Sequence, residues 1–224
     1  MNRLAISLLT GVAALGFISS VQAADLIISE PAPVVGVVNT GGNWDGVYVG
    51  AFAGYGWGTL TEEDGVFAPP GTDYDISGWQ LGVAAGANFT ISEAIVAGLV
   101  ADIAWADIGG SNDDFAPLEY NINWLASVRG RLGFDGGAFL PYLTAGLAVA
   151  NNTVGIDGGG PDDTQTHIGW TVGAGVEFAV ADNISLDLLY RYSDYGSKTY
   201  AFDGGVSDFN LTAHTISAGV NFKF

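Results

Sequence analysis

The last nine residues of the chain alternate strictly between apolar and polar side chains. The apolar positions are held by Ile216, Ala218, Val220, Phe222 and Phe224. Successive side chains of a β-strand point to opposite faces, so this pattern predicts a strand with one apolar and one polar face. The apolar face must contact either a second sheet, as in a soluble sandwich, or lipid, as in a transmembrane barrel.

The same alternation recurs in eight segments between Trp44 and Phe224. The connections at one end are tight, at residues 90–93, 135–137 and 181–183, whereas those at the other end are long. An even strand count with short turns at one end and long loops at the other is typical of outer-membrane barrels and not of Greek-key sandwiches. The sequence therefore predicts an all-β fold, an eight-stranded antiparallel up-and-down transmembrane β-barrel.

Aromatic residues on the outward face fall into two rings when they are placed by parity alone. The ring at the long-loop end contains Trp57, Trp79, Trp105, Trp124, Trp170 and Tyr192. The ring at the short-turn end contains Phe89, Phe134, Phe178, Phe222 and Phe224. Aromatic girdles flank the lipid-facing band of such barrels, whereas aromatic residues of a soluble core would be scattered.

Composition supports the same fold class and excludes others. Apolar residues make up 49% of the chain and charged residues 13%, which is too apolar for a disordered protein. No apolar run reaches the ~20 residues of a transmembrane helix. The net charge of −18 would repel nucleic-acid phosphates, so no nucleic-acid partner is expected. The absence of cysteine excludes disulfides and thiolate metal sites.

Three parts of the chain are expected. Residues 1–23 have the charged start, the apolar core and the Val21-Gln22-Ala23 cleavage site of a secretory signal peptide. The alternative, a membrane anchor, would need a longer core. Residues 24–43 are rich in Pro and Gly and predict an extended periplasmic tether, which begins with Ala24 and Asp25 after cleavage. Residues 44–224 form the predicted barrel.

The inward face carries most of the basic residues of the predicted barrel. Its charged residues are Asp102, Arg129, Arg131, Glu177, Asp187, Arg191 and Lys223. Charges removed from bulk water need partners, so these residues predict a network of lumenal ion pairs. The alternative is a charged constriction that selects ions, but eight strands leave an interior that side chains can fill. The many inward glycines favour a further alternative, a thread of water along the lumen. Glu177 and Asp187 also have the residue types of a hydrolase pair, but no cleft is predicted beside them.

The long loops are acidic. Their acidic residues are Glu62, Glu63, Asp64, Asp73, Asp75, Asp107, Asp113, Asp114, Glu119, Asp157, Asp162, Asp163, Asp203 and Asp208. This charge is explained by solubility and by repulsion between exposed tips, or by divalent cations that bridge the loops to phosphorylated surface lipid. His167 and His214 are assigned to opposite faces, so no shared metal or haem site is predicted. We expect no cofactor and no catalytic site.

The residues Trp44-Asp45-Gly46-Val47-Tyr48-Val49-Gly50, followed by Gly54-Tyr55-Gly56-Trp57-Gly58, carry a resemblance to a known family. With the Ala24-Asp25 start, Asp102, Arg129-Gly130-Arg131 and Phe224, the chain resembles the small alphaproteobacterial outer-membrane β-barrel family. This is the porin-like, major-surface-antigen group related to opacity proteins. Val100 departs from the pattern, because a second inward acid is expected at that position.

The resemblance implies an abundant structural protein of the outer membrane, with long loops outside the cell and both termini in the periplasm. It implies contact with outer-membrane lipid and lipopolysaccharide, and insertion by the assembly machinery that reads the C-terminal strand. It also implies a covalent link between the Ala24-Asp25 start and peptidoglycan. A narrow porin-like channel and a surface-loop binding or adhesion protein are the alternative functions.

Overall fold

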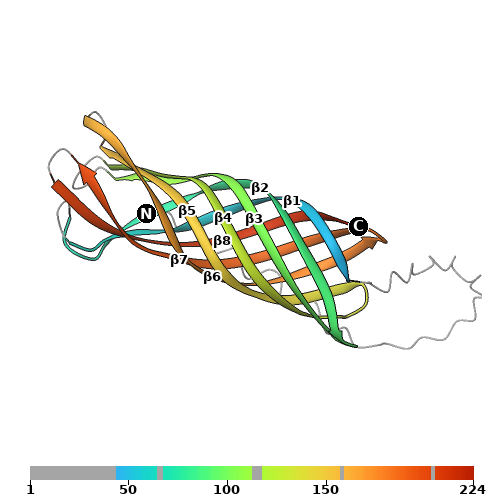
Figure 1. Cartoon of the computed structure of the whole chain (residues 1–224). Coiled ribbons are helices and arrows are strands. Elements are labelled where there is room, and N and C mark those ends of the chain that lie inside the picture. The colour runs from blue at the N-terminus through green and yellow to red at the C-terminus, as the bar shows by residue number, and fades with distance from the viewer. Residues whose placement is uncertain (1–43, 65–67, 113–117, 157–158, 203–204) are drawn as a thin grey trace, which may run out of the picture. The chain divides into compact units, whose positions relative to one another are not determined.

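The computed structural model describes residues 44–64, 68–112, 118–156, 159–202 and 205–224. Its eight strands form one closed antiparallel barrel in which each strand pairs with its neighbours in the sequence and β8 returns to β1 (Figure 1). The strands are β1 (Gly46–Glu62), β2 (Thr72–Ser92), β3 (Ile95–Asn112), β4 (Leu118–Phe134), β5 (Phe139–Ile156), β6 (Gly159–Ala181), β7 (Ile184–Phe202) and β8 (Gly205–Lys223). The predicted fold is confirmed. Among the described residues, no helix has the length and apolar character needed to cross a membrane.

The pairing of the first and last strands closes the barrel. The register of β1 and β8 runs from Tyr48 opposite Lys223 to Glu62 opposite Phe209. The backbone N–H of Phe224 adds one more bond, 3.0 Å long, to the carbonyl of Val47. Closure leaves no sheet edge exposed to lipid, where an unsatisfied backbone group would cost several kcal/mol.

The outward face is apolar along the short-turn half of the barrel. Leu143, Leu147 and Val128 are 67%, 65% and 59% exposed, and they are surrounded by other exposed aliphatic side chains. A soluble monomer rarely exposes an apolar surface of this extent. The band is therefore the surface that contacts lipid.

The predicted long loops are mostly strand, and this part of the prediction is wrong. The connections are only residues 63–71, 113–117, 157–158 and 203–204. Asp73, Asp107 and Asp162, which are predicted in loops, lie within strands. The strands continue beyond the aromatic ring and form what we call the extended end; the opposite end is the short-turn end.

The strands continue because their apolar and polar faces exchange places at the extended end. On β8, the polar residues Ser217 and Asn221 are buried in the lumen. Nearer the start of the strand, at the extended end, the buried residues are the apolar Leu211 and Phe209. The extended end thus has an apolar interior and a polar exterior, as in a water-soluble protein. Its interior, the outer plug, consists of Leu60, Ala68, Tyr74, Ile76, Ile108, Tyr120, Ile122, Leu125, Ala148, Ala150, Val154, Tyr195, Tyr200, Phe209, Leu211 and Ala213.

A β-bulge overturns one parity assignment at this end. Ile122 has the same parity as the outward Trp124 and should therefore face outward, but it is fully buried in the outer plug. The register between β4 and β5 shifts between Ile122 and Trp124, so an extra residue turns the side chains beyond it to the other face. Asn123 is correspondingly exposed.

Glu62 also lies in the outer plug and not in an exposed loop as expected. Its side chain is fully buried. One carboxylate oxygen accepts hydrogen bonds from the Ala68 amide at 2.9 Å and the Tyr74 hydroxyl at 3.1 Å. The buried acid therefore fixes the start of the first connection against β2.

The barrel wall divides into two sheets at the extended end. Pairing between β6 and β7 begins at Trp170 opposite Asp194, although both strands continue beyond that point. Pairing between β2 and β3 likewise stops at Ser77 opposite Gly109. Strands β3–β6 and strands β7, β8, β1 and β2 therefore form two sheets that enclose the outer plug.

A smaller apolar cluster lies at the short-turn end. Trp44, Val96 and Leu140 are buried there, with Ala179 packed against them, and we call this cluster the inner plug. Asp45, which follows Trp44 in the sequence, accepts a hydrogen bond from the backbone N–H of Thr90 and a second, 2.8 Å long, from the Thr90 hydroxyl. These contacts attach the chain just before β1 to the end of β2.

Candidate functional site

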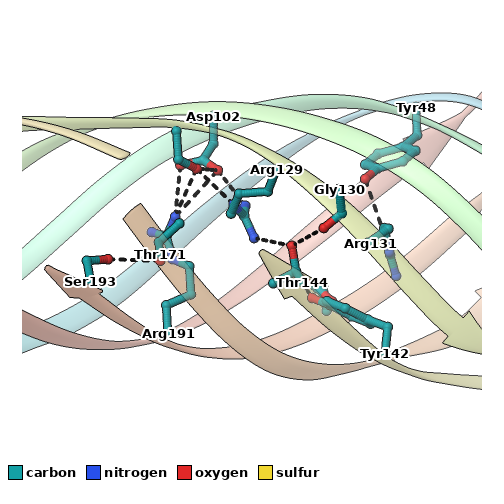
Figure 2. Close-up of polar contacts among 12 residues, drawn as sticks. Tyr48, Asp102, Arg129, Gly130, Arg131, Tyr142, Thr144, Thr171, Arg191 and Ser193 are labelled. Carbon is teal, nitrogen blue, oxygen red and sulfur yellow. Dashed lines mark hydrogen bonds and ion pairs between the residues drawn. The ribbon is translucent and has the colours of Figure 1, made fainter. Parts of the chain in front are cut away.

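The lumenal charges predicted from the sequence form two groups between the plugs. In the first group, Asp102 on β3 forms ion pairs with Arg129 on β4 and, at 3.2 Å, with Arg191 on β7 (Figure 2). Ser127 donates to Asp102 at 2.7 Å and accepts from Arg129 at 2.8 Å. All four side chains are buried. One carboxylate thus joins two arginines from non-adjacent strands.

The second group is centred on Arg131. Its guanidinium forms an ion pair with Glu177 at 2.8 Å and lies 3.9 Å above the ring centroid of Tyr142. It also donates to the Tyr48 hydroxyl at 3.3 Å. The Tyr142 hydroxyl in turn donates to Asp187 at 2.8 Å. Arg131 is therefore held by a carboxylate, a hydroxyl and an aromatic face.

The remaining predicted residue lies further along the lumen. Lys223 is half-buried at the short-turn end, where it is opposite Tyr48 in the register of β1 and β8. The two central groups together contain three acidic residues, Asp102, Glu177 and Asp187, and three basic residues, Arg129, Arg131 and Arg191. Three acids and three bases give no formal net charge, which suits a structural network better than a charged filter.

The inward glycines make room for aromatic rings. A Cβ atom added at Gly86 would lie 2.4 Å from the Tyr48 ring, and one at Gly175 would lie 2.5 Å from the Tyr142 ring. The glycines therefore let side chains from neighbouring strands fill the barrel, and the thread of water considered above does not have this space.

One small internal cavity, of about 40 Å³, is lined by the charged groups. Such a volume holds only a few water molecules. The cavity also reaches Asp187, which is opposite Glu177 in the register of β6 and β7. A sugar ring does not fit in a cavity of this volume, so the cavity gives the pair of acids no room for a glycoside substrate.

A third polar group, separate from the two charged groups, lies among the apolar residues of the extended end, beyond Trp170. The buried His167 ring donates from Nδ1 to the Gly196 carbonyl at 3.2 Å, and its Nε2 accepts from the Tyr200 hydroxyl at 2.7 Å. Asn152 donates to that hydroxyl at 3.0 Å. These bonds use both ring nitrogens of a neutral imidazole and join β6 to β7, where their backbones no longer pair.

The six residues of the predicted outer aromatic ring all lie on the outside of the barrel. Trp57, Trp79, Trp105 and Trp170 are exposed, and Trp124 and Tyr192 are half-buried. His214 lies on the same outer surface, stacked on Trp57 and hydrogen-bonded to Tyr190 at 2.7 Å. The phenylalanines Phe89, Phe134, Phe178, Phe222 and Phe224 are exposed near the other end of the strands.

The apolar residues of the C-terminal strand, Ile216, Ala218, Val220, Phe222 and Phe224, are all exposed on the outer surface. Ala24 and Asp25 lie outside the described residues. His167 and His214 occupy opposite faces of the wall, inside and outside. Across the described ranges, no cluster of three or more His, Asp or Glu side chains is arranged to hold a metal ion.

Sequence reasoning missed the two plugs, which close the lumen as firmly as the charges do. The apolar residues Leu60, Ile76, Ile108 and Leu211 stand at inward parity and could have indicated the outer plug. The predicted strands β1 to β3 end at the aromatic ring, so Leu60, Ile76 and Ile108 fall in the predicted loops.

We predict that Asp102→Ala destabilises the barrel by about 3–5 kcal/mol, because two buried arginines lose their carboxylate. Urea-dependent unfolding in lipid vesicles measures the loss. Asp182→Ala, in the exposed β6–β7 turn, is the matched control and should change stability by less than about 0.5 kcal/mol. Equal effects of the two substitutions would contradict the structural role of Asp102.

The second prediction concerns the stability of the folded protein at acidic pH. Burial, together with the charge of Lys198, lowers the pKa of His167 from its ordinary value. The unfolded chain therefore binds a proton near pH 6.5 while the folded chain resists it, so stability falls as the pH drops below about 6.5. In urea titrations at pH 7.5 and 5.5, His167→Gln should lose part of this pH dependence. His214→Gln should retain it, and an unchanged pH dependence in His167→Gln would disprove the assignment.

The chain matches known proteins over nearly its whole length. Residues 10–224 match the family model described as outer membrane protein beta-barrel domain. The chain is 33% identical over 227 residues, covering all of both chains, to the 25 kDa outer-membrane immunogenic protein of Brucella abortus biovar 1 (strain 9-941). It is 35% identical over 189 residues to the 22 kDa outer membrane protein of Rhizobium leguminosarum bv. viciae, covering 84% of this chain and 81% of that one.

The fold also has a counterpart among solved structures. The crystal structure of Neisserial surface protein A aligns with a TM-score of 0.50 and 23% identity, over 80% of this chain and 97% of that one. This likeness concerns the fold alone. The matched family model describes an outer-membrane β-barrel domain, and the names of the two relatives describe outer-membrane proteins and no enzyme, which agrees with the expectation of no catalytic site. The chain belongs to the outer membrane protein beta-barrel domain family and is a protein of the outer membrane.

Proposed function

We propose that the protein is a structural element of the envelope, a closed barrel that links the outer membrane to the cell wall. The observation that carries this proposal is the blocked lumen. The inner plug, the two charge groups and the outer plug follow one another along the barrel axis. The space among the charges is only about 40 Å³. In the part of the chain that the structure describes, side chains fill the lumen, and a barrel of this kind would serve to anchor and display and not to conduct solutes.

The way the chain enters the barrel favours a tether at the short-turn end. Trp44 is buried in the inner plug and Asp45 is hydrogen-bonded to Thr90, so a pull on the preceding chain acts on side chains packed inside the barrel. The roughly 20 residues between Ala24 and Trp44 can span at most about 70 Å. This end, with the short turns, would face the periplasm, and the extended end would face the outside.

The assembly machinery is the second partner in this proposal. The last strand has an unbroken apolar face formed by Ile216, Ala218, Val220 and Phe222. The rings of Phe222 and Phe224 pack together with their centroids 5.2 Å apart. Because β8 must pair with β1 to complete the barrel, it is the strand whose recognition would control closure.

The alternative of a narrow channel makes the opposite prediction for ion flow. In planar bilayers, the folded protein should give no stable ohmic step at 100 mV, because the side chains of the two plugs, among the described residues, occupy the lumen. Folding is checked in the same sample by the altered mobility of unheated protein in electrophoresis. Reproducible unit conductance that scales linearly with voltage would favour the channel.

The tether is tested on cell-wall preparations. Peptidoglycan digested with a muramidase and then with trypsin should release a muropeptide joined to the N-terminal peptide that begins at Ala24, identified by mass spectrometry. An adduct there also requires the short-turn end to be periplasmic. Deletion of residues 26–43 should reduce the adduct, since a shortened chain cannot span the distance. An N-terminal peptide found only in its unmodified form would refute the tether.

A further inference from the structure

A polar groove on the outer surface of the extended end is unrelated to the lumen. It is an open groove with a volume of about 600 Å³, and it crosses β2 to β6. Its lining includes Trp79, Asp107, Glu119, Asn121, Asn123 and Asp162. The pairing of β2 and β3 ends in this region, at Ser77 opposite Gly109, so the groove begins at the division between the two sheets and extends over the sheet formed by β3–β6.

Hydrogen bonds between strands hold the polar side chains of the groove in place. Asn121 donates to Asp107 at 2.8 Å, and Asn123 donates to Thr153 at 2.8 Å and to Asn151 at 3.2 Å. These bonds use both N–H groups of Asn123 and one of Asn121. The amide oxygens of both side chains and the carboxylates of Glu119 and Asp162 are acceptors that a ligand can use.

The groove therefore suits a ligand with many donors and no negative charge. No basic residue is among its described lining residues, and its three carboxylates would repel a phosphate. Hydroxyl groups are the donors that match several acceptors without adding charge. Trp79, which is 53% exposed, adds an apolar ring face beside them. A sugar, with hydroxyls at its edges and apolar C–H faces, has this combination.

The position of the groove indicates how such a sugar would arrive. Trp79 belongs to the aromatic ring at the edge of the lipid-facing band, and Leu81 and Val83, which follow it on β2, are each about half exposed toward lipid. A lipid whose acyl chains lie against Leu81 and Val83 has its headgroup at the level of Trp79. The groove continues the lipid-contacting surface directly into the headgroup region.

We propose that the groove binds the headgroup of an uncharged glycolipid of the outer leaflet, with its sugar against Trp79 and its hydroxyls on Asn121, Asn123 and Glu119. This inference rests on the proposed function only for its assignment to the outer leaflet. Binding in detergent micelles does not depend on orientation or on a tether, so the two proposals can fail separately.

Native mass spectrometry of the full-length mature protein in micelles tests the site, with digalactosyldiacylglycerol as the probe and phosphatidylcholine as the reference lipid. The wild type should retain the glycolipid about ten-fold more tightly than the reference, as a few added hydrogen bonds provide. The double substitution Asn121→Ala and Asn123→Ala should abolish this preference. The control, Asn210→Ala with Ser197→Ala, removes a comparable pair bonded at 3.4 Å on β7 and β8 and should keep it.

Four results would overturn the proposal. The first is retention of both lipids to the same extent, and the second is an equal loss of glycolipid binding in the groove and control variants. The third is binding of free digalactosylglycerol as tight as that of the lipid, which would indicate a site for soluble glycans. The fourth is a preference for phosphatidylglycerol that requires Mg²⁺ and disappears with EDTA, which would indicate an anionic lipid bridged by a cation.

Discussion

Every backbone N–H and C=O inside a bilayer must find its hydrogen-bond partner within the protein, because lipid offers none. In this chain the requirement is met by the pairing of β1 with β8, which turns eight strands into a ring without edges. Closure then dictates the alternation of side chains. Outward positions must be apolar where they contact lipid, and inward positions must fill a lumen that is too narrow for a column of water.

The lumenal ion pairs have more to do with register than with net stability. A buried ion pair loses much of its Coulomb energy to desolvation. However, Asp102 on β3 joins Arg129 on β4 to Arg191 on β7, and these three strands are not all adjacent. A slip of β4 by one residue would carry Arg129 and Ser127 to the lipid face and leave Asp102 with Arg191 alone of its three partners. The network thus penalises wrong pairings of the strands far more than it stabilises the correct one.

The alternation of apolar and polar residues was sufficient to predict the strands and their order, because amphipathic strands of this length have few other folds open to them. It could not locate the bulge that turns Ile122 inward, since one extra residue is visible only as a break in pairing. Nor could it show that Gly86 and Gly175 accommodate tyrosine rings from neighbouring strands. The outer plug was missed for another reason. Alternation shows that a strand has an apolar face, but it does not show whether that face points outward to lipid or inward to the interior of the barrel.

That ambiguity is resolved at the aromatic ring, where the medium outside the barrel changes from lipid to water. On the lipid side, the apolar face of each strand must point outward and the polar face inward; on the water side, burial of apolar area requires the reverse. Along β8, Ser217 and Leu211 are both buried, although the outer surface of the wall faces lipid at Ser217 and water at Leu211. The extended end therefore has its own apolar core, and its two sheets do not need lipid to stay folded. Its outer surface is consequently free to carry polar residues such as Asn121 and Asn123.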